Sequence, residues 1–419
     1  MDKGEAFLSG VAAAEADLRL LFEPTPLQRN DYLSGKYGAD IWLKREDLSP
    51  VRSYKIRGAA NAMRKALAAD PTRRRFVCAS AGNHAQGMAY ACRHYRTEGV
   101  IFMPVTTPQQ KIDKTRMFGG PAVEIRLVGD YFDDTLKAAQ AFCAEAGAIF
   151  LPPFDSADVI EGQATCALEI LAQLPAQCAV DLLVMPVGGG GLAAGMVRFF
   201  AERSPATVCR FVEPGGGPSL RRALEAGGLV TLPKVDNFVD GAAVARIGDL
   251  NFATLARFPA TDVLIAPEDR LCQTMLEMLN VEGMVLEPAG ALAVDALRDL
   301  GPLEGRTVVA VVSGGNFDFE RLPEVKERAL RWEGRKKYFI LRIPQRPGAL
   351  RDFLNLLGPG DDIARFEYLK KSARNFGSVL IGIESPDRAE SEALLARMDA
   401  AGLTYLDITD DPVITNLIV

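Results

Sequence analysis

The sequence predicts a two-lobed α/β domain followed by a smaller α+β domain. From about residue 41 to residue 315, strand-like runs alternate with helix-like runs, as in parallel α/β proteins. Several of these strand-like runs are continuously apolar, which is typical of strands buried on both faces. After Phe319 the pattern changes to shorter, alternating strands. Because the first part is too long for one compact sheet, we expect it to form two lobes with a cleft between them.

The predicted elements of the first domain begin with a helix over Glu5–Leu21, which ends before Pro24 and Pro26. Strands then follow, with helix-like segments between them. In parallel sheets of this kind, ligands bind at the carboxyl ends of the strands. The predicted strands are Ile41–Leu43, Phe76–Ala79, Val100–Met103, Ala122–Leu127, Ala148–Leu151, Leu182–Pro186, Cys209–Val212, Val263–Ile265 and Val308–Val312.

The C-terminal part opens with a charged, helix-like stretch, Glu320–Lys337, which we interpret as a linker. Beyond it the predicted order is strand, helix, strand, strand, helix, strand, which is the ferredoxin-like split unit. We therefore expect a first domain at residues 1–320, a linker at 321–337 and a second domain at 338–419. One predicted helix ends at Leu357, and the other spans Ala389–Ala400. The predicted strands are Tyr338–Ile343, Ile363–Leu369, Ser378–Ile383 and Thr404–Ile408.

Composition excludes several classes of protein. The chain has 419 residues, 48% of them apolar and 24% charged, as in soluble globular proteins of two or three domains. The net charge of −6 argues against a nucleic-acid surface, and no apolar run reaches the roughly 18 residues of a membrane span. The acidic start lacks the basic region of a signal peptide. The seven cysteines form no Cys-x-x-Cys pair, so we expect reduced thiols in the cytoplasm.

Lys55 is the first candidate functional residue. It lies between a strand-like stretch, Ile41–Lys44, and a helix-like stretch, Ile56–Leu67, with Ser53 in the place of an N-cap. The positive end of a helix disfavours a cation by about 0.3–1 kcal/mol, which lowers the pKa of the amine. A neutral amine is the form that reacts with a carbonyl cofactor. The alternative is a solvated surface lysine, the usual state of this residue type.

The second candidate is the turn Ser80–Gly87, which follows a predicted strand and precedes a helix. Such a turn exposes backbone N–H groups at the positive end of the helix, and so it can hold a carboxylate. Asn83 could also donate a hydrogen bond to a ring hydroxyl. The alternatives are an ordinary strand-to-helix turn with Asn83 as the cap, and a hydrogen-bonded turn histidine rather than a catalytic base at His84.

The third candidate is the run Gly188-Gly189-Gly190-Gly191-Leu192, between a buried strand and a helix. Consecutive glycines let backbone amides crowd around an anion, and a phosphate is the usual ligand. The run also fits the dinucleotide pattern G-x-G-x-x-A, with Glu213 near the expected distance beyond it. That alternative is weaker because such patterns usually occupy the first βαβ unit.

The fourth candidate is Ser313, which follows the apolar strand Val308–Val312 and precedes two glycines. A neutral hydroxyl that faces a pyridine nitrogen would leave that nitrogen unprotonated, whereas a carboxylate would favour protonation. Taken alone, Ser313 is more often a turn residue at the end of a strand, and that alternative is favoured.

Together these stretches resemble the threonine dehydratase family of fold-type II pyridoxal-phosphate enzymes, whose catalytic domain has the tryptophan synthase β-like fold. The match covers residues 20–320 in the family's order. It comprises Lys44–Leu48, Ser53–Ala59, Ser80–Gly87, Gly188–Leu192, Glu287–Ala291 and Ser313–Asn316.

The resemblance implies roles for the candidate residues. Pyridoxal 5'-phosphate would be bound covalently to Lys55, with its ring hydroxyl near Asn83 and its pyridine nitrogen near Ser313. Its phosphate would be held by Gly188, Gly189, Gly190, Gly191 and Leu192. The substrate carboxylate would bind the loop of Ser80, Ala81, Gly82, Asn83 and His84.

The C-terminal part resembles the single ACT-like regulatory domain of short biosynthetic threonine dehydratases, through Arg346–Leu350 and Phe366–Lys371. This resemblance implies L-isoleucine, or L-valine, as an effector. A sheet with one uncovered face usually needs a partner, so we expect a homo-oligomer, a tetramer or dimer. Related racemases have a metal site after a Val-Glu-Pro; here Gly215–Ser219 follows and the second acidic ligand is missing, so we expect no metal.

The implied reaction is the dehydration and deamination of L-threonine to 2-oxobutanoate and ammonia, the first step of isoleucine biosynthesis. In it, the amine of Lys55 would remove the Cα proton. Other activities stay open on the same residues: dehydration or racemisation of L-serine or hydroxyaspartate, an amino-acid sensor without turnover, and an NAD-dependent oxidoreductase.

Overall fold

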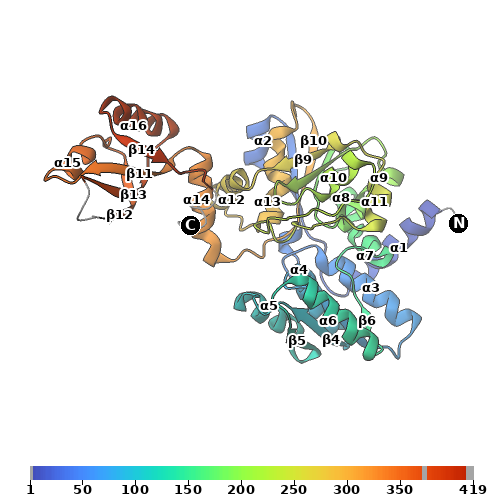
Figure 1. Cartoon of the computed structure of the whole chain (residues 1–419). Helices are drawn as coiled ribbons and strands as arrows, with labels where there is room; N and C mark the ends of the chain where they lie inside the picture. Colours follow the sequence, from blue (N-terminus) through green and yellow to red (C-terminus); the bar gives the residue numbers. More distant parts are fainter. Residues whose placement is uncertain (1–2, 370–374, 412–419) are drawn as a thin grey trace. The chain divides into compact units, whose positions relative to one another are not determined.

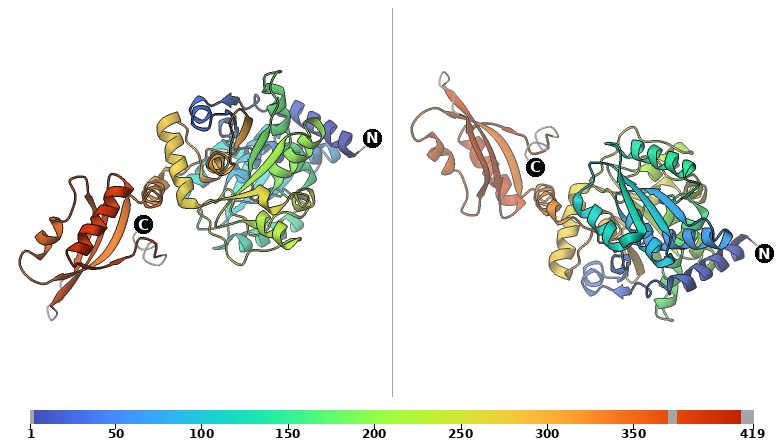
Figure 2. Two further views of the ribbon diagram at one scale, coloured as in Figure 1. Left: turned by 90° about the horizontal axis from the view of Figure 1, so that it is seen from above. Right: turned by 90° about the horizontal axis from the view of Figure 1, so that it is seen from below.

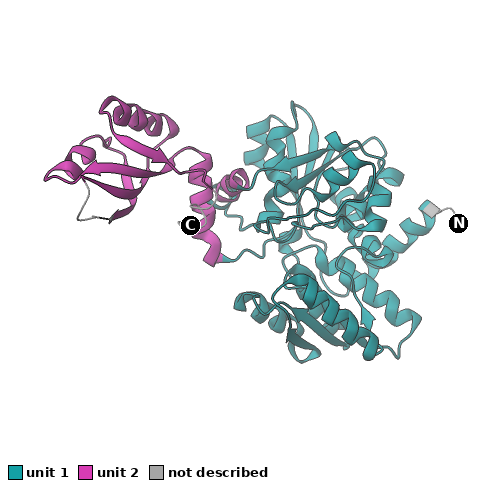
Figure 3. Ribbon diagram, in the orientation of Figure 1, with its two compact units in different colours: residues 1–268, 278–318 teal, residues 269–277, 319–419 magenta. Residues whose placement is uncertain are grey.

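The computed structural model of the chain describes residues 3–369 and 375–411 (Figure 1). The chain divides into two compact units, residues 1–268 with 278–318 and residues 269–277 with 319–419 (Figure 3). Among the described residues, no helix is both long enough and apolar enough to cross a membrane.

The larger sheet of the first unit has six strands in the order β1-β2-β10-β7-β8-β9. All neighbouring strands are parallel except β1 and β2. The central strands β7 and β10 are buried along almost their whole length, as their continuous apolar sequences predict. The strands are β1 (Leu27–Arg29), β2 (Asp40–Arg45), β7 (Leu182–Pro186), β8 (Val208–Pro214), β9 (Val263–Ala266) and β10 (Thr307–Val312).

The smaller sheet of this unit has four parallel strands in the order β5-β4-β3-β6. Alternate residues of β3 face opposite layers of helices: Phe76 and Cys78 belong to one apolar cluster, and Val77 and Ala79 to another. Two separate sheets in one unit confirm the expected two-lobed α/β fold. The strands are β3 (Arg75–Ala79), β4 (Glu98–Met103), β5 (Val123–Leu127) and β6 (Ile149–Phe150).

Helices flank both sheets (Figures 1 and 2). Three of them, α3, α4 and α9, begin at or beside a candidate residue, and α13 begins within the matched stretch Glu287–Ala291. The α-helices up to residue 295 are α1 (Lys3–Leu18), α2 (Asp31–Tyr37), α3 (Lys55–Ala69), α4 (Asn83–Tyr95), α5 (Gln109–Gly119), α6 (Phe132–Glu145), α7 (Ala157–Gln163), α8 (Thr165–Gln173), α9 (Gly191–Arg203), α10 (Ser219–Ala226), α11 (Asp249–Leu255), α12 (Glu268–Glu282) and α13 (Pro288–Asp295).

The second unit contains an antiparallel four-stranded sheet in the order β12-β13-β11-β14, which confirms the predicted split β-α-β-β-α-β unit. Its core combines Phe339, Leu341 and Ile381 of the sheet with Leu394 and Met398 of α16. Of the stretch Phe366–Lys371, the last two residues lie outside the described part of the chain. The elements are α14 (Leu322–Trp332), β11 (Lys336–Pro344), α15 (Ala349–Leu354), β12 (Asp362–Leu369), β13 (Phe376–Glu384), α16 (Arg388–Ala400) and β14 (Thr404–Asp407).

Some predicted boundaries differ from the structure. The first helix ends at Leu18 rather than Leu21, and the strand predicted at Ala148–Leu151 is only Ile149–Phe150. The stretch 320–337 holds a helix, α14, as its helix-like pattern predicts, but β11 begins within this stretch, at Lys336. The short strand β1 was not predicted, because its three residues form a strand only by pairing with β2.

Candidate active site

Lys55 lies in the first turn of α3, as expected, and the helix begins at Lys55 itself, one residue before the predicted Ile56; Ser53 is not its N-cap. The residue before the helix is Tyr54, and it makes no side-chain capping bond. Ser53 instead forms an isolated bridge with Gly314, and the Tyr54 N–H donates to the carbonyl oxygen of Ser313 at 3.2 Å. The start of α3 is thus fixed by the turn that follows β10, a long-range contact that residue type alone cannot reveal.

The amine of Lys55 is held in a partly buried, mainly apolar setting. Nζ donates to the carbonyl oxygen of Pro153 at 2.9 Å and lies 5.3 Å and 5.8 Å from the ring centres of Tyr54 and Phe154. Burial lowers the pKa of Lys55 to about 8, against an opposing effect of the Glu287 charge. The direction is the one expected from the sequence, and its main cause is burial.

The glycine run forms the turn between β7 and α9. Gly190 has a φ of 90°, and a Cβ at Gly189 would lie 2.2 Å from the ring of Phe154. The side-chain amide of Asn251 donates to the Gly189 carbonyl at 2.6 Å and holds the turn in place. The turn therefore needs glycine for steric reasons, and it leads directly into the N-terminus of α9, where backbone N–H groups are available to an anion.

Phe154 connects Lys55 to this glycine turn, although the two lie far apart in the sequence. Its ring faces the Lys55 amine and packs against Gly189, and its carbonyl oxygen lies 2.9 Å from the Cβ position of Gly191. One loop, which follows β6, therefore touches both the amine and the predicted phosphate cradle.

The turn between β3 and α4 carries the Ser80–His84 loop. The N-cap of α4 is Gly82, so the interpretation of Asn83 as the cap is wrong. The Ser80 hydroxyl accepts from the Gly82 N–H at 3.3 Å. His84 is buried, and its Nε2 lies 2.9 Å from the carbonyl oxygen of Leu151. Burial, and then the charge of Lys55, lower the pKa of His84 to about 3, so the ring is neutral and hydrogen-bonded, and it lies in the first turn of α4 rather than in the preceding turn.

The side-chain amide of Asn83 joins two other segments of this site, through Glu287 and Asn316. Its Nδ2 donates to Glu287 Oε1 at 2.7 Å, and its Oδ1 accepts from Asn316 Nδ2 at 2.8 Å. Glu287 lies in one of the stretches that match the family, but no role was expected for it. Burial, and then the charge of Asp240, raise the pKa of Glu287 to about 7. An acidic residue directly before the proline that opens α13 was the only signal in the sequence.

Ser313 follows β10 and is 4% exposed. Its hydroxyl donates to the carbonyl oxygen of Ala289 at 3.2 Å. The side chain is neutral. The backbone carbonyl of Ser313 accepts a hydrogen bond from the N–H of Tyr54, which places Ser313 beside the start of α3.

Glu213, the acidic residue of the dinucleotide alternative, is fully committed elsewhere. It is buried, and its carboxylate accepts from the backbone N–H groups of Leu220 and Arg221 at 2.7 and 2.9 Å. Because the Glu213 carboxylate accepts hydrogen bonds from free N–H groups at the N-terminus of α10, it is not placed to bind a ribose hydroxyl.

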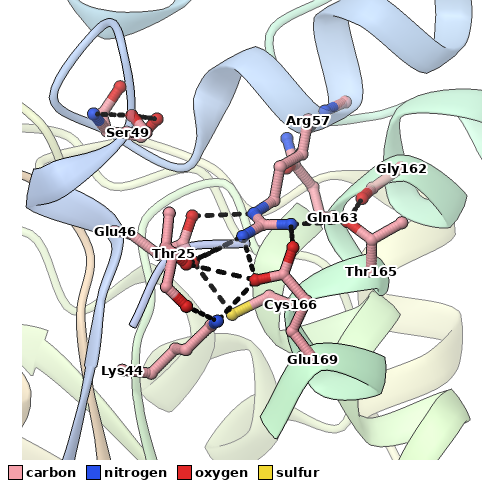
Figure 4. Close-up of polar contacts among 12 residues, drawn as sticks. Thr25, Lys44, Glu46, Ser49, Arg57, Gly162, Gln163, Thr165, Cys166 and Glu169 are labelled. Atoms are coloured by element: carbon pink, nitrogen blue, oxygen red, sulfur yellow. Dashed lines mark hydrogen bonds and ion pairs between the residues drawn. The ribbon is translucent and has the colours of Figure 1, made fainter. Parts of the chain in front are cut away.

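A buried ion cluster anchors α3 to neighbouring segments through Arg57 (Figure 4). Arg57 pairs with Glu46 and Glu169, each at 2.7 Å, and Lys44 also pairs with Glu169. The Thr25 hydroxyl donates to Glu46 at 2.6 Å. Burial alone raises the pKa of Glu169, but Arg57 and Lys44 hold it at about 2. Arg57 is two residues from Lys55, so this cluster anchors the helix that carries the amine.

The residues of this site fit pyridoxal phosphate. The glycine turn at the start of the 13-residue helix α9 suits the phosphate, and the Lys55 amine suits the aldehyde. Two buried polar atoms near the start of α3 and Asn83, Ser53 Oγ and Asn316 Oδ1, have no hydrogen-bond partner among the described residues. Such atoms mark a place where a polar group can bind.

Comparisons with known proteins agree with this fit. A family model described as pyridoxal-phosphate dependent enzyme matches residues 18–314, and one described as the C-terminal regulatory domain of threonine dehydratase matches residues 327–418. The chain is 47% identical to the biosynthetic L-threonine dehydratase IlvA of Bacillus subtilis strain 168, over 94% of this chain and 93% of the relative.

Two solved structures are similar to about three quarters of this chain. The processed form of threonine deaminase isoform 2 from Solanum lycopersicum has a TM-score of 0.73 and 35% identity, over 78% of this chain and 94% of that one. The structure of maize serine racemase has a TM-score of 0.69 and 25% identity, over 77% of this chain and 98% of that one.

Proposed function

Because the chain belongs to the pyridoxal-phosphate dependent enzymes, and among them to the threonine dehydratases, we propose that it converts L-threonine to 2-oxobutanoate and ammonia at a site built around Lys55. The contact of one residue, Phe154, with both Lys55 and the glycine turn is the observation that best supports this site. It brings a reactive amine and an anion cradle together.

Each candidate residue has a proposed role. The backbone of Gly188–Leu192 binds the cofactor phosphate, Asn83 donates to the ring hydroxyl, and the neutral hydroxyl of Ser313 faces the ring nitrogen. The Ser80–His84 loop binds the substrate carboxylate through its backbone N–H groups. When bound, pyridoxal phosphate supplies the electron sink that makes the Cα proton acidic.

Lys55 is the proposed base. Its amine, with a pKa of about 8, is partly neutral near physiological pH and can take the Cα proton. The β-hydroxyl then leaves as water, and hydrolysis of the resulting enamine releases ammonia and 2-oxobutanoate. Dehydration or racemisation of L-serine or hydroxyaspartate is the second candidate, and of these activities the similarity to maize serine racemase supports racemisation of serine.

The second unit is proposed to regulate the first. We propose the division into a catalytic domain at 1–320, a linker at 321–337 and a regulatory domain at 338–419 that binds L-isoleucine or L-valine, as expected of the first enzyme of isoleucine synthesis. Its edge strand β12 exposes two aromatic side chains, Phe366 and Tyr368. Exposed edge strands of this kind pair readily with a second copy, which supports a homo-oligomer, a dimer or tetramer.

A cytoplasmic location is also proposed. The cysteines are free thiols, and all except Cys178 are buried. This state is the usual one in a reducing compartment.

The experiment is a 2-oxobutanoate assay with L-threonine, with L-serine in parallel, and with or without L-isoleucine or L-valine. Turnover of threonine that isoleucine suppresses supports both the reaction and the regulator. Preferential turnover of serine favours the second candidate, and indifference to both effectors overturns the regulatory proposal. No keto acid from either substrate contradicts the proposed reaction.

A further inference from the structure

Glu287 lies where three segments of the candidate site meet. It directly precedes α13 and is 6% exposed. Its Oε1 lies 2.7 Å from Asn83 Nδ2 and only 2.2 Å from the Cβ position of Gly314, the residue after Ser313. Its charge also acts on the Lys55 amine. The carboxyl group does not serve as a cap, because the N-terminus of α13 receives no side-chain hydrogen bond from it.

The hydrogen bonds around Asn83 give its side-chain amide one orientation. Nδ2 faces the acceptor Glu287, and Oδ1 faces the donor Asn316, whose Nδ2 also donates to the carbonyl oxygen of Val51 at 2.8 Å. Reversing the amide would set two donors against each other and two acceptors against each other. In the observed orientation Asn83 uses one N–H on Glu287 and has a second N–H to offer.

We propose that Glu287 is a positioning residue, which holds the side-chain amide of Asn83 in the orientation that binds the cofactor. This inference rests on the placement of pyridoxal phosphate at Lys55 and Asn83 proposed above. The role of Glu287 is indirect, because its carboxyl group contacts Asn83 and Asn83 in turn contacts the cofactor.

The charges around Glu287 provide a second readout. Burial and then the charge of Asp240 raise the pKa of Glu287, whereas the Asn83 amide, the charge of Lys111 and the backbone N–H of Asn316 lower it. The charge of Glu287 also acts to raise the pKa values of Lys114 and Tyr54. Because the Glu287 charge opposes the fall in the pKa of Lys55, a neutral replacement leaves that amine with a lower pKa.

The test measures the affinity of the cofactor-free full-length chain for pyridoxal phosphate by absorbance titration, in the wild type, E287L, E287Q, N83A and the E287L/N83A double variant. Leucine removes both acceptor oxygens, whereas glutamine keeps one. Glu213→Gln is the matched control, because Glu213 is also buried and its pKa is also raised to about 7, but it binds α10 instead of Asn83.

We expect E287L to weaken the affinity about 10-fold or more, as the loss of a buried hydrogen bond does, and E287Q by about threefold at most. In the N83A background, E287L should add less than about a twofold loss, since Asn83 is no longer there to be held. The pH midpoint of cofactor capture should fall in E287Q and stay at the wild-type value in E213Q.

Equal effects of E287L in both backgrounds, or an unchanged affinity of E287L, would overturn the inference while Lys55 chemistry stands. If E287L does not fold, E287D takes its place, because its carboxylate is one methylene shorter and moves away from Asn83, and it should show the same non-additivity. A wild-type chain that does not bind pyridoxal phosphate at all contradicts the proposed function and this inference with it.

Discussion

The amine of Lys55 donates a hydrogen bond to the carbonyl oxygen of Pro153 across 2.9 Å. This bond joins the start of α3 to the loop after β6. The next residue in that loop, Phe154, packs against Gly189 of the glycine turn. The proposed catalytic amine is therefore positioned by the same loop that shapes the proposed phosphate cradle.

The first prediction concerns the pH at which the cofactor-free chain captures pyridoxal phosphate. Only the neutral amine reacts, so capture should rise with pH and level off above the pKa of Lys55, about 8. Stopped-flow absorbance from about pH 6 to about pH 11 measures the midpoint. A midpoint of about 10, that of an ordinary lysine, would show that burial does not lower the pKa of Lys55.

The second prediction concerns the glycine turn. Gly189→Ala places a Cβ 2.2 Å from the ring of Phe154, and overpacking of this kind costs about 1–3 kcal/mol. We expect the Kd for pyridoxal phosphate to rise about 10- to 100-fold. Gly35→Ala in α2 is the control, because nothing lies within 4 Å of its Cβ position; an equal affinity of the two variants would exclude this turn from the cofactor site.

The third prediction concerns the ion cluster behind α3. Arg57→Leu leaves the buried carboxylates of Glu46 and Glu169 without their main partner, and we expect the free energy of unfolding to drop by about 3–5 kcal/mol. Urea unfolding measures it. Arg75→Ala breaks the exposed pair with Glu98 and should cost at most about 1 kcal/mol. Similar losses in both variants would mean that the cluster does not anchor the helix.

The fourth prediction is a loss of stability in acid. Arg57 and Lys44 hold the pKa of Glu169 at about 2 in the folded chain, whereas an unfolded glutamate has a pKa of about 4.3. The stabilisation is present in full above the unfolded value and disappears as the pH falls toward the folded one. The slope of unfolding free energy against pH in this range should be shallower in Glu169→Gln; identical slopes would contradict the pairing.

Much of the fold was predictable because its signals are local. The apolar run Leu182–Pro186 is strand β7 to the residue, and the order of elements after residue 336 follows from short alternating runs. Boundaries failed where a distant segment decides them. Ser53 has the residue type of a cap, but its pairing with Gly314 sets its backbone.

The candidate site was predictable as separate stretches and not as an arrangement. Lys55, Asn83, the glycine run and Ser313 each stand at a strand or helix end that the pattern marks. The contacts of Phe154 and Glu287 depend on packing between segments many residues apart. No local sequence pattern predicts such long-range contacts, so the roles of Phe154 and Glu287 are evident only from the structure.

Identifying the lysine that carries the cofactor tests the central claim most directly. Borohydride reduction of the enzyme with bound pyridoxal phosphate fixes the cofactor to the amine that holds it, and peptide mass mapping then locates the label. We predict a pyridoxyl group on the peptide that contains Lys55. In the Lys55→Ala variant, both this label and the formation of 2-oxobutanoate should be lost. A label on another lysine, or a Lys55→Ala variant that still deaminates threonine, would contradict the account.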